Sequence, residues 1–170
     1  GGNLQGLSIN PGCTLFNMKV AVDTFPLLQA VYEALGEGPS TDIYGGWGYG
    51  LHVINMSFTF LQNLVSPAEV RMLADGIRWC FKNGCVTVAS SGKEPGNWSS
   101  YPASIRQKNM ILNVAGSKLN GHGNTGYSFG PLVDVTAPSL VDQIAAPGHD
   151  STSAYYTVGG TSCSAAYVSG

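Results

Sequence analysis

Short apolar runs constrain the fold of this chain more than any other feature of its sequence. Three of them span residues 53–57, 85–89 and 110–115. The first shows no clean alternation of apolar and polar positions, which is typical of a strand in a parallel sheet with both faces covered. Because helix signals alternate with the strands, the sequence predicts an α/β fold with a mostly parallel sheet. Right-handed crossovers would place helices on both of its faces.

The clearest helix signal begins at Ser66. This residue can cap the amide at the third helical position, Glu69 closes the capping box, and Pro67 suits the first helical position. Asn83-Gly84 stops the helix. The apolar residues that recur between these boundaries at helical spacing are Val70, Leu73, Ile77 and Phe81.

Shorter signals predict four further elements. An apolar run indicates a strand at 14–20, and proline and glycine punctuation indicates a helix at 26–35. A stretch rich in glycine and aromatic residues at 36–50 is typical of a loop. A short strand is predicted at 132–135, ended by Ala137-Pro138.

Composition narrows the class of protein. The length of 170 residues suits one domain, 1–170, and the 44% apolar content excludes disorder. Only 11% of the residues are charged, against about 25% in a typical domain. Eight scattered basic residues make no stripe for nucleic-acid phosphates, and no apolar run approaches the length of a membrane span. A start at Gly1 without methionine indicates a processed piece, and sequons at Asn55 and Asn97 favour a secreted or lumenal origin.

Four cysteines leave the disulfide arrangement open. Three pairings are arithmetically allowed if all four are oxidised, and no pair has the C-x-x-C spacing of a zinc site. Cys80 and Cys85 flank a predicted helix end, so they either bridge that end to the next strand or remain buried free thiols.

Two patterns imitate functional motifs but are predicted to be structural. Residues 121–126 fit G-x-G-x-x-G, yet the following residues cannot open the helix that a dinucleotide site needs, so the glycines are assigned to turns. Asp23 and His52 are conceivable as acid and base, but Asp23 fits a helix entrance better. His122 and His149 are assigned to surface loops.

Residues 159–170 carry the strongest chemical signal. A serine, Ser162, stands between a glycine turn and a helix-forming run. There its hydroxyl would lie over a helix N-terminus, where free amides and the helix dipole favour developing negative charge. The alternative is that Thr161 or Ser162 is simply the N-cap of that helix.

A resemblance decides between these alternatives. Gly160-Thr161-Ser162-x-x-Ala165-x-x-Val168-x-Gly170 resembles the nucleophile motif of subtilisin-like serine proteases. Other segments of nearly the whole chain are similar to segments of that family, in the family's order. These segments are Ser8–Val20, Val53–Ser57, Val86–Gly92, Tyr101–Ala103 and Tyr127–Pro138.

The resemblance implies a doubly wound α/β fold and hydrolysis of peptide bonds by a Ser-His-Asp triad. Ser162 would be the nucleophile, and its N–H would be one oxyanion donor. Ser57-Phe58-Thr59 and Ser90-Ser91-Gly92 would form two backbone edges that pair with a peptide or protein substrate. The resemblance further implies a cis peptide at Tyr101-Pro102. The family often binds calcium, but the sequence identifies no ligands for it, and no other cofactor is expected.

The sequence also departs from the family. The His and Asp motifs of the family precede the region where this chain begins, so a missing N-terminal segment or second chain would supply them, and this chain alone is expected to be inactive. The fold is therefore expected to be incomplete at both ends, with apolar surface left uncovered by the helix that reaches Gly170. An oxyanion asparagine is replaced by Lys93, and Phe58-Thr59-Phe60 replaces glycines.

These departures keep a second function open. Lys93 could donate to the oxyanion, act as base in a Ser-Lys dyad, or point to solvent, and the solvent-facing arrangement is favoured. The alternative function is a catalytically inactive pseudoprotease that serves as a scaffold or binding module. A nucleotide-binding domain based on Gly121-His122-Gly123 is a third class, and cofactor binding is not expected.

Overall fold

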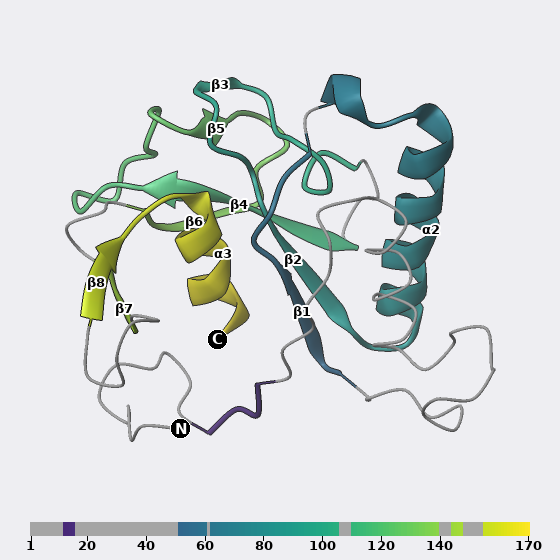
Figure 1. The fold of residues 1–170 in the computed structure, drawn as a ribbon, viewed down its shortest axis with the longest axis horizontal. Coiled ribbons are helices and arrows are strands. Elements are labelled where there is room, and N and C mark those ends of the chain that lie inside the picture. Colours follow the sequence, from purple (N-terminus) through teal and green to yellow (C-terminus); the bar gives the residue numbers. More distant parts are fainter. Residues whose placement is uncertain (1–11, 16–50, 61, 106–109, 140–143, 148–154) are drawn as a thin grey trace.

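A four-stranded parallel sheet lies at the centre of the described structure (Figure 1). In the order in which they pair, the strands are β1 (Val53–Met56), β2 (Val86–Ser90), β4 (Ile111–Ser117) and β6 (Val135–Pro138). This computed structural model describes residues 12–15, 51–60, 62–105, 110–139, 144–147 and 155–170. The α/β class and the parallel sheet predicted from the sequence are confirmed.

Helix α2 (Pro67–Lys82) has the boundaries that its sequence predicts. The Ser66 hydroxyl accepts from the amide of Glu69 (3.3 Å), and the Glu69 carboxylate accepts from the amide of Ser66 (2.7 Å), which completes the capping box. At the other end the chain turns at Gly84, whose φ is +74°. There the amide of Cys85 donates to the carbonyl of Cys80 (2.9 Å) and closes a Schellman motif.

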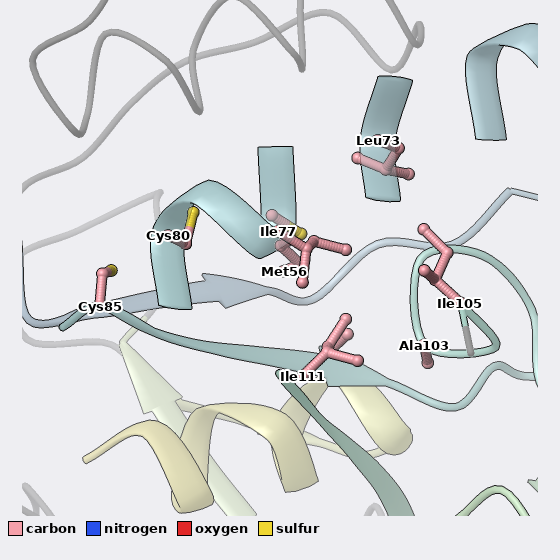
Figure 2. Packing of buried hydrophobic residues seen from close by; sticks show 9 residues of the cluster. Met56, Leu73, Ile77, Cys80, Cys85, Ala103, Ile105 and Ile111 are labelled. Atoms are coloured by element: carbon pink, nitrogen blue, oxygen red, sulfur yellow. The ribbon is translucent and has the colours of Figure 1, made fainter. Parts of the chain in front are cut away.

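The two helices α2 and α3 (Thr161–Ser169) cover opposite faces of the sheet (Figure 1). Side chains of α2 pack with Met56, Ala89 and Ile111 in one buried cluster, here called the α2-side cluster, whose buried residues Figure 2 shows. Residues of α3 pack on Val88 and Val114, which point to the other face. Helices on both faces are therefore confirmed, as a doubly wound fold requires.

Short elements that the sequence did not predict surround this centre. The 3-10 helix η1 (Gln62–Leu64) precedes α2. Strands β3 (Gly96–Asn97) and β5 (Ser128–Phe129) pair in parallel, whereas β7 (Ile144–Pro147) and β8 (Tyr155–Val158) pair in antiparallel. Each of these elements has four residues or fewer, which is too short to show a periodic pattern of apolar residues in the sequence.

One predicted strand is wrong in its position. The segment 132–135 was expected to be extended, but β6 begins only at Val135. The amide of Val133 donates to Gly130 in a turn, and the chain meets β4 where the amide of Asp134 donates to the carbonyl of Asn113 (3.0 Å). The turn therefore makes the strand begin three residues later than predicted, and the strand extends to Pro138. Proline has no N–H to donate to a neighbouring strand, so the end of a strand is a position where it is accepted.

Other predictions fall partly or wholly on residues that the structure does not describe. The helix at 26–35 and the loop at 36–50 lie outside the described residues. Of the strand predicted at 14–20, only Thr14 and Leu15 are described, and they have no regular secondary structure. Gly121, with a φ of +79°, and Gly126 lie in a bend and a turn as predicted, whereas Gly123 pairs with Ser117 in an isolated antiparallel bridge.

Candidate active site

Ser162 is the second residue of α3 and is exposed to solvent. The N-cap is Gly160, whose φ is +110° and which offers no side chain to the amides of the first turn. The interpretation of Thr161 or Ser162 as the N-cap is therefore wrong. The amide of Ser162 belongs to the first turn, whose N–H groups have no partner four residues back, so helix geometry leaves it available to an anion.

Ser162 and Ser57 form a reciprocal pair of hydrogen bonds. The hydroxyl of Ser162 donates to the carbonyl oxygen of Ser57 (2.9 Å), and the hydroxyl of Ser57 donates to the carbonyl oxygen of Ser162 (2.9 Å). The side-chain amide of Asn55 in turn donates to the Ser57 hydroxyl (2.9 Å). These bonds hold the start of α3 against the residue that follows β1, at the edge of the sheet where parallel strands end and where open α/β folds bind ligands.

Thr161 joins α3 to the second predicted substrate-binding segment. Its hydroxyl donates to the carbonyl of Gly92 (3.1 Å), and the amide of Gly92 donates back to the same hydroxyl oxygen (3.3 Å). The φ of Gly92 is +128°, and a Cβ there would lie 2.7 Å from the hydroxyl of Ser128 and 2.9 Å from that of Ser100. Glycine is therefore required at this position, and both predicted segments lie beside Ser162.

The backbone groups of Ser91 and Gly92 are all hydrogen-bonded within the chain. The amide of Ser91 donates to Val114 (2.9 Å) and its carbonyl accepts from Ser100 (2.8 Å), while the carbonyl of Gly92 also accepts from the amide of Ser128 (3.2 Å). Ser90 is paired with Val114 in the sheet, and all three residues of this segment are buried. Strand addition needs free backbone groups, so the 90–92 segment offers a wall rather than an open edge in this structure.

The bulky residues that follow Ser57 face the core. Phe58 and Phe60 meet edge to face, with ring centroids 5.7 Å apart, and both pack against the α2-side cluster. Phe60 also exchanges two backbone hydrogen bonds with Tyr101 (2.8 and 3.1 Å), next to the cis peptide at Tyr101-Pro102 that the resemblance implies. The two phenyl rings therefore extend the α2-side cluster while staying partly buried, and Lys93 is exposed.

The described residues provide no histidine in hydrogen-bond contact with Ser162. His52 precedes β1, whereas Ser57 follows it, and five residues of extended chain separate the two by roughly 16 Å. His122 lies in the turn after β4, where its carbonyl accepts from the amide of Lys118 (2.8 Å). Asp23 and His149 lie outside the described residues.

Three further observations concern metal sites, membrane-spanning helices and cavities in the described part of the chain. No group of three or more His, Cys, Asp and Glu residues is arranged there to hold a metal ion. Nor is any helix there long and apolar enough to cross a membrane. A cavity of about 250 Å³ lies beside β3 and β5, and none of the candidate site residues lines it. Its lining residues are Gln62, Asn97, Trp98, Ser99, Phe129, Pro131 and Leu132.

Comparison with known proteins places the fold. No protein-family model and no curated protein matches the chain. Among solved structures, the prenylagaramide maturation protease PagA is 18% identical (TM-score 0.65), with 92% of this chain and 50% of PagA covered. The self-cleaved protease domain of PatA is 19% identical (TM-score 0.66; 88% and 49% covered), and a serine-to-alanine mutant of that domain is 19% identical (TM-score 0.61; 86% and 46% covered).

The chain spans about half the length of these protease structures. At such low identity the likeness shows the fold and leaves the activity to be argued from the site. The fold predicted from the sequence is therefore confirmed, and it is the subtilisin-like fold of protease domains.

Proposed function

We propose that this chain is the serine-bearing part of a subtilisin-like serine endopeptidase, with Ser162 as the nucleophile. The observation that carries the proposal is the position of Ser162: solvent-exposed, in the first turn of α3, at the carboxyl edge of a parallel sheet. A serine that served only packing or capping would not need to be exposed beside its own amide, which helix geometry leaves available to an anion. The shared fold of PagA and PatA supports the proposal.

The proposed reaction is acyl transfer. The Ser162 oxygen attacks the scissile carbonyl, and the tetrahedral oxyanion accepts a hydrogen bond from the amide of Ser162. The serine proton passes to a histidine, oriented by an aspartate, and from there to the leaving amine. Both partners lie outside the described residues, in an N-terminal segment or a second chain. A complementing chain is therefore part of the proposal.

The hydrogen bond from Ser162 to Ser57 marks the resting arrangement of the hydroxyl. A rotation about the Cα–Cβ bond redirects the proton from the Ser57 carbonyl toward an incoming base without moving α3. The Ser57 carbonyl is then free to accept a hydrogen bond from a substrate amide. This makes 57–59 the substrate-pairing edge, opposite the wall formed by Ser90, Ser91 and Gly92.

Lys93 lies next to that wall and completes the proposed oxyanion region with Gly92 and Ser162. Because Lys93 is exposed, its ammonium group is hydrated and reaches the oxyanion only by turning inward from solvent. We assign it a weaker contribution than the Ser162 amide. The proposed substrate is a peptide or protein in a secretory or extracellular compartment.

Labelling tests the nucleophile. In the presence of its complementing chain, the protein should react covalently with a fluorophosphonate at Ser162, and Ser162→Ala should abolish labelling and peptide cleavage together. Ser169→Ala is the matched control, because Ser169 lies at the far end of the same helix and its hydroxyl only donates to the carbonyl of Ala165 (2.8 Å). Labelling that persists in Ser162→Ala would overturn the assignment.

The pseudoprotease is the second candidate function. It is favoured by the exposed Lys93 and by the intrachain hydrogen bonds of Ser91 and Gly92. Lys93→Asn distinguishes the two candidates. In an active enzyme the asparagine would add an uncharged oxyanion donor and raise turnover, whereas a pseudoprotease would show no cleavage with either residue. Lys118→Asn, an exposed lysine in the turn after β4, is the control for the change of charge.

A further inference from the structure

Two buried cysteines meet where α2 ends and β2 begins. Cys80 lies in the last turn of α2 and Cys85 immediately precedes β2, with exposed fractions of 0% and 1%. The hydrogen bond from the amide of Cys85 to the carbonyl of Cys80 closes the turn between them. Figure 2 shows both side chains at one end of the α2-side cluster.

The two thiols are close enough to shift each other's pKa. The neighbouring Cys85 thiol lowers the pKa of Cys80 by favouring its thiolate, and the same neighbour together with burial raises the pKa of Cys85. The hydroxyl of Thr87 lies next to Cys80 and also favours its thiolate. This hydroxyl is buried and has no hydrogen-bond partner among the described residues. The polar side chain thus faces a sulfur that can become an anion.

The other two cysteines have different surroundings. Cys13 is exposed, and Cys163 lies on α3, which covers the opposite face of the sheet from α2. All four are free thiols in this structure. Of the three pairings that the sequence allows, one joins two buried cysteines that a hydrogen-bonded turn already holds together.

We propose that Cys80 and Cys85 are a disulfide-forming pair that fastens the end of α2 to the start of β2. The oxidant class is a small-molecule disulfide. The Cys80 thiolate attacks it, forms a mixed disulfide and releases one small thiolate. The Cys85 sulfur then attacks Cys80 of the mixed disulfide and releases the second. Two protein thiols become one disulfide, and the two protons pass to the released thiolates.

The consequence is a redox-dependent link between a helix and the strand that leads to the candidate site. β2 ends at Ser90, two residues before Gly92, so oxidation would hold the opposite end of the same strand. The link rests on the hydrogen-bonded turn that joins the two buried cysteines, and it does not depend on the proposed protease function.

Equilibration in a glutathione redox buffer tests the proposal on the 170-residue chain. After acid quenching and alkylation, trypsin cleaves after Arg78, Lys82 and Lys93, so an 80–85 disulfide joins the peptides 79–82 and 83–93. The yield of this linked pair gives the effective concentration of one thiol at the other. In the native chain we expect this effective concentration to exceed the value in guanidinium chloride by about tenfold or more, because the folded turn holds the two cysteines together.

Circular dichroism of the native sample establishes that the chain is folded under the conditions compared. Cys85→Ser should remove the linked peptides, and Cys163→Ser is the matched control that should retain them. An effective concentration in the folded chain equal to or below that of the denatured chain would overturn the proposal. So would a dominant native pairing of Cys80 or Cys85 with Cys13 or Cys163.

Discussion

The two faces of the sheet differ in how completely they are covered. On the α2 face, nine buried residues form one cluster, and partly buried side chains such as Phe58 and Phe60 extend it. On the α3 face, the buried cluster has four members. A band of apolar side chains at the amino ends of the strands stays exposed there by 37–44%. The band consists of Val53, Val86, Leu112 and Val135.

The strand register places this band on the α3 face. Val53 pairs with Val86, two residues before Val88, and Val88 pairs with Leu112. Because Val88 is buried beneath α3, its neighbours on the same face lie at the margin of that helix. The exposed band agrees with the expectation of apolar surface beside α3. Stability is therefore concentrated on the α2 face, and the candidate chemistry lies on the α3 face.

The largest effect is predicted for Ser162→Ala, which should remove catalytic activity and leave the stability of the fold nearly unchanged. In the complemented protein, Ser162→Ala should lower the turnover of a peptide substrate by about six orders of magnitude, because a triad without its nucleophile retains only binding and oxyanion stabilisation. The urea midpoint should hardly change, since the exposed hydroxyl makes one hydrogen bond to Ser57. A large drop in the midpoint would show that the α3 face also carries stability.

The opposite result is predicted for the α2 face. Ile77 is fully buried between α2 and the sheet, so Ile77→Ala should cost about 2–5 kcal/mol of unfolding free energy through lost burial and a cavity. Urea denaturation followed by circular dichroism measures this. At urea concentrations where the variant stays folded, its fluorophosphonate labelling rate should equal that of the parent. A slower rate in folded protein would contradict the separation of the two faces.

The two faces also differ in what the sequence revealed. The capping box at Ser66 and the glycine at 84 are local signals, so the boundaries of α2 were predictable from a few residues. The reciprocal bonds between Ser57 and Ser162 join residues 105 positions apart, and no local pattern encodes them. The resemblance supplied the two residues as separate motifs, and the fold supplied their contact.

Intrachain competition explains what the sequence could not show at 90–92. The resemblance implied a substrate-pairing edge at 90–92, yet the partners of Ser91 come from β4 and from the segment at Ser100. Such pairing depends on tertiary structure. The late start of β6 has the same origin, because a turn at Gly130 competes with the β-forming residues that follow it.

A smaller effect is predicted at the start of α2. Ser66→Ala removes the side chain that accepts from the amide of Glu69, so it should cost about 1 kcal/mol of unfolding free energy. Ser66→Asp, which keeps an acceptor at the N-cap, should retain most of that stability and is the matched control. Equal losses in both variants would indicate that the serine acts through packing rather than through capping.

The smallest effect sharpens the comparison within a single strand. Val86 and Val88 lie two residues apart on the same face of β2, with exposed fractions of 44% and 1%. Val86→Ala should change the unfolding free energy by less than about 0.5 kcal/mol, whereas Val88→Ala should cost about 2 kcal/mol. Paired urea titrations measure the difference. If both substitutions cost the same, the exposed band is covered when the protein is folded in solution, and the contrast between the faces disappears. If the unfolding free energy lost in Val86→Ala increases with protein concentration, the exposed band is covered by a second protein molecule. Only binding of a partner makes the stability contribution of a surface residue depend on protein concentration.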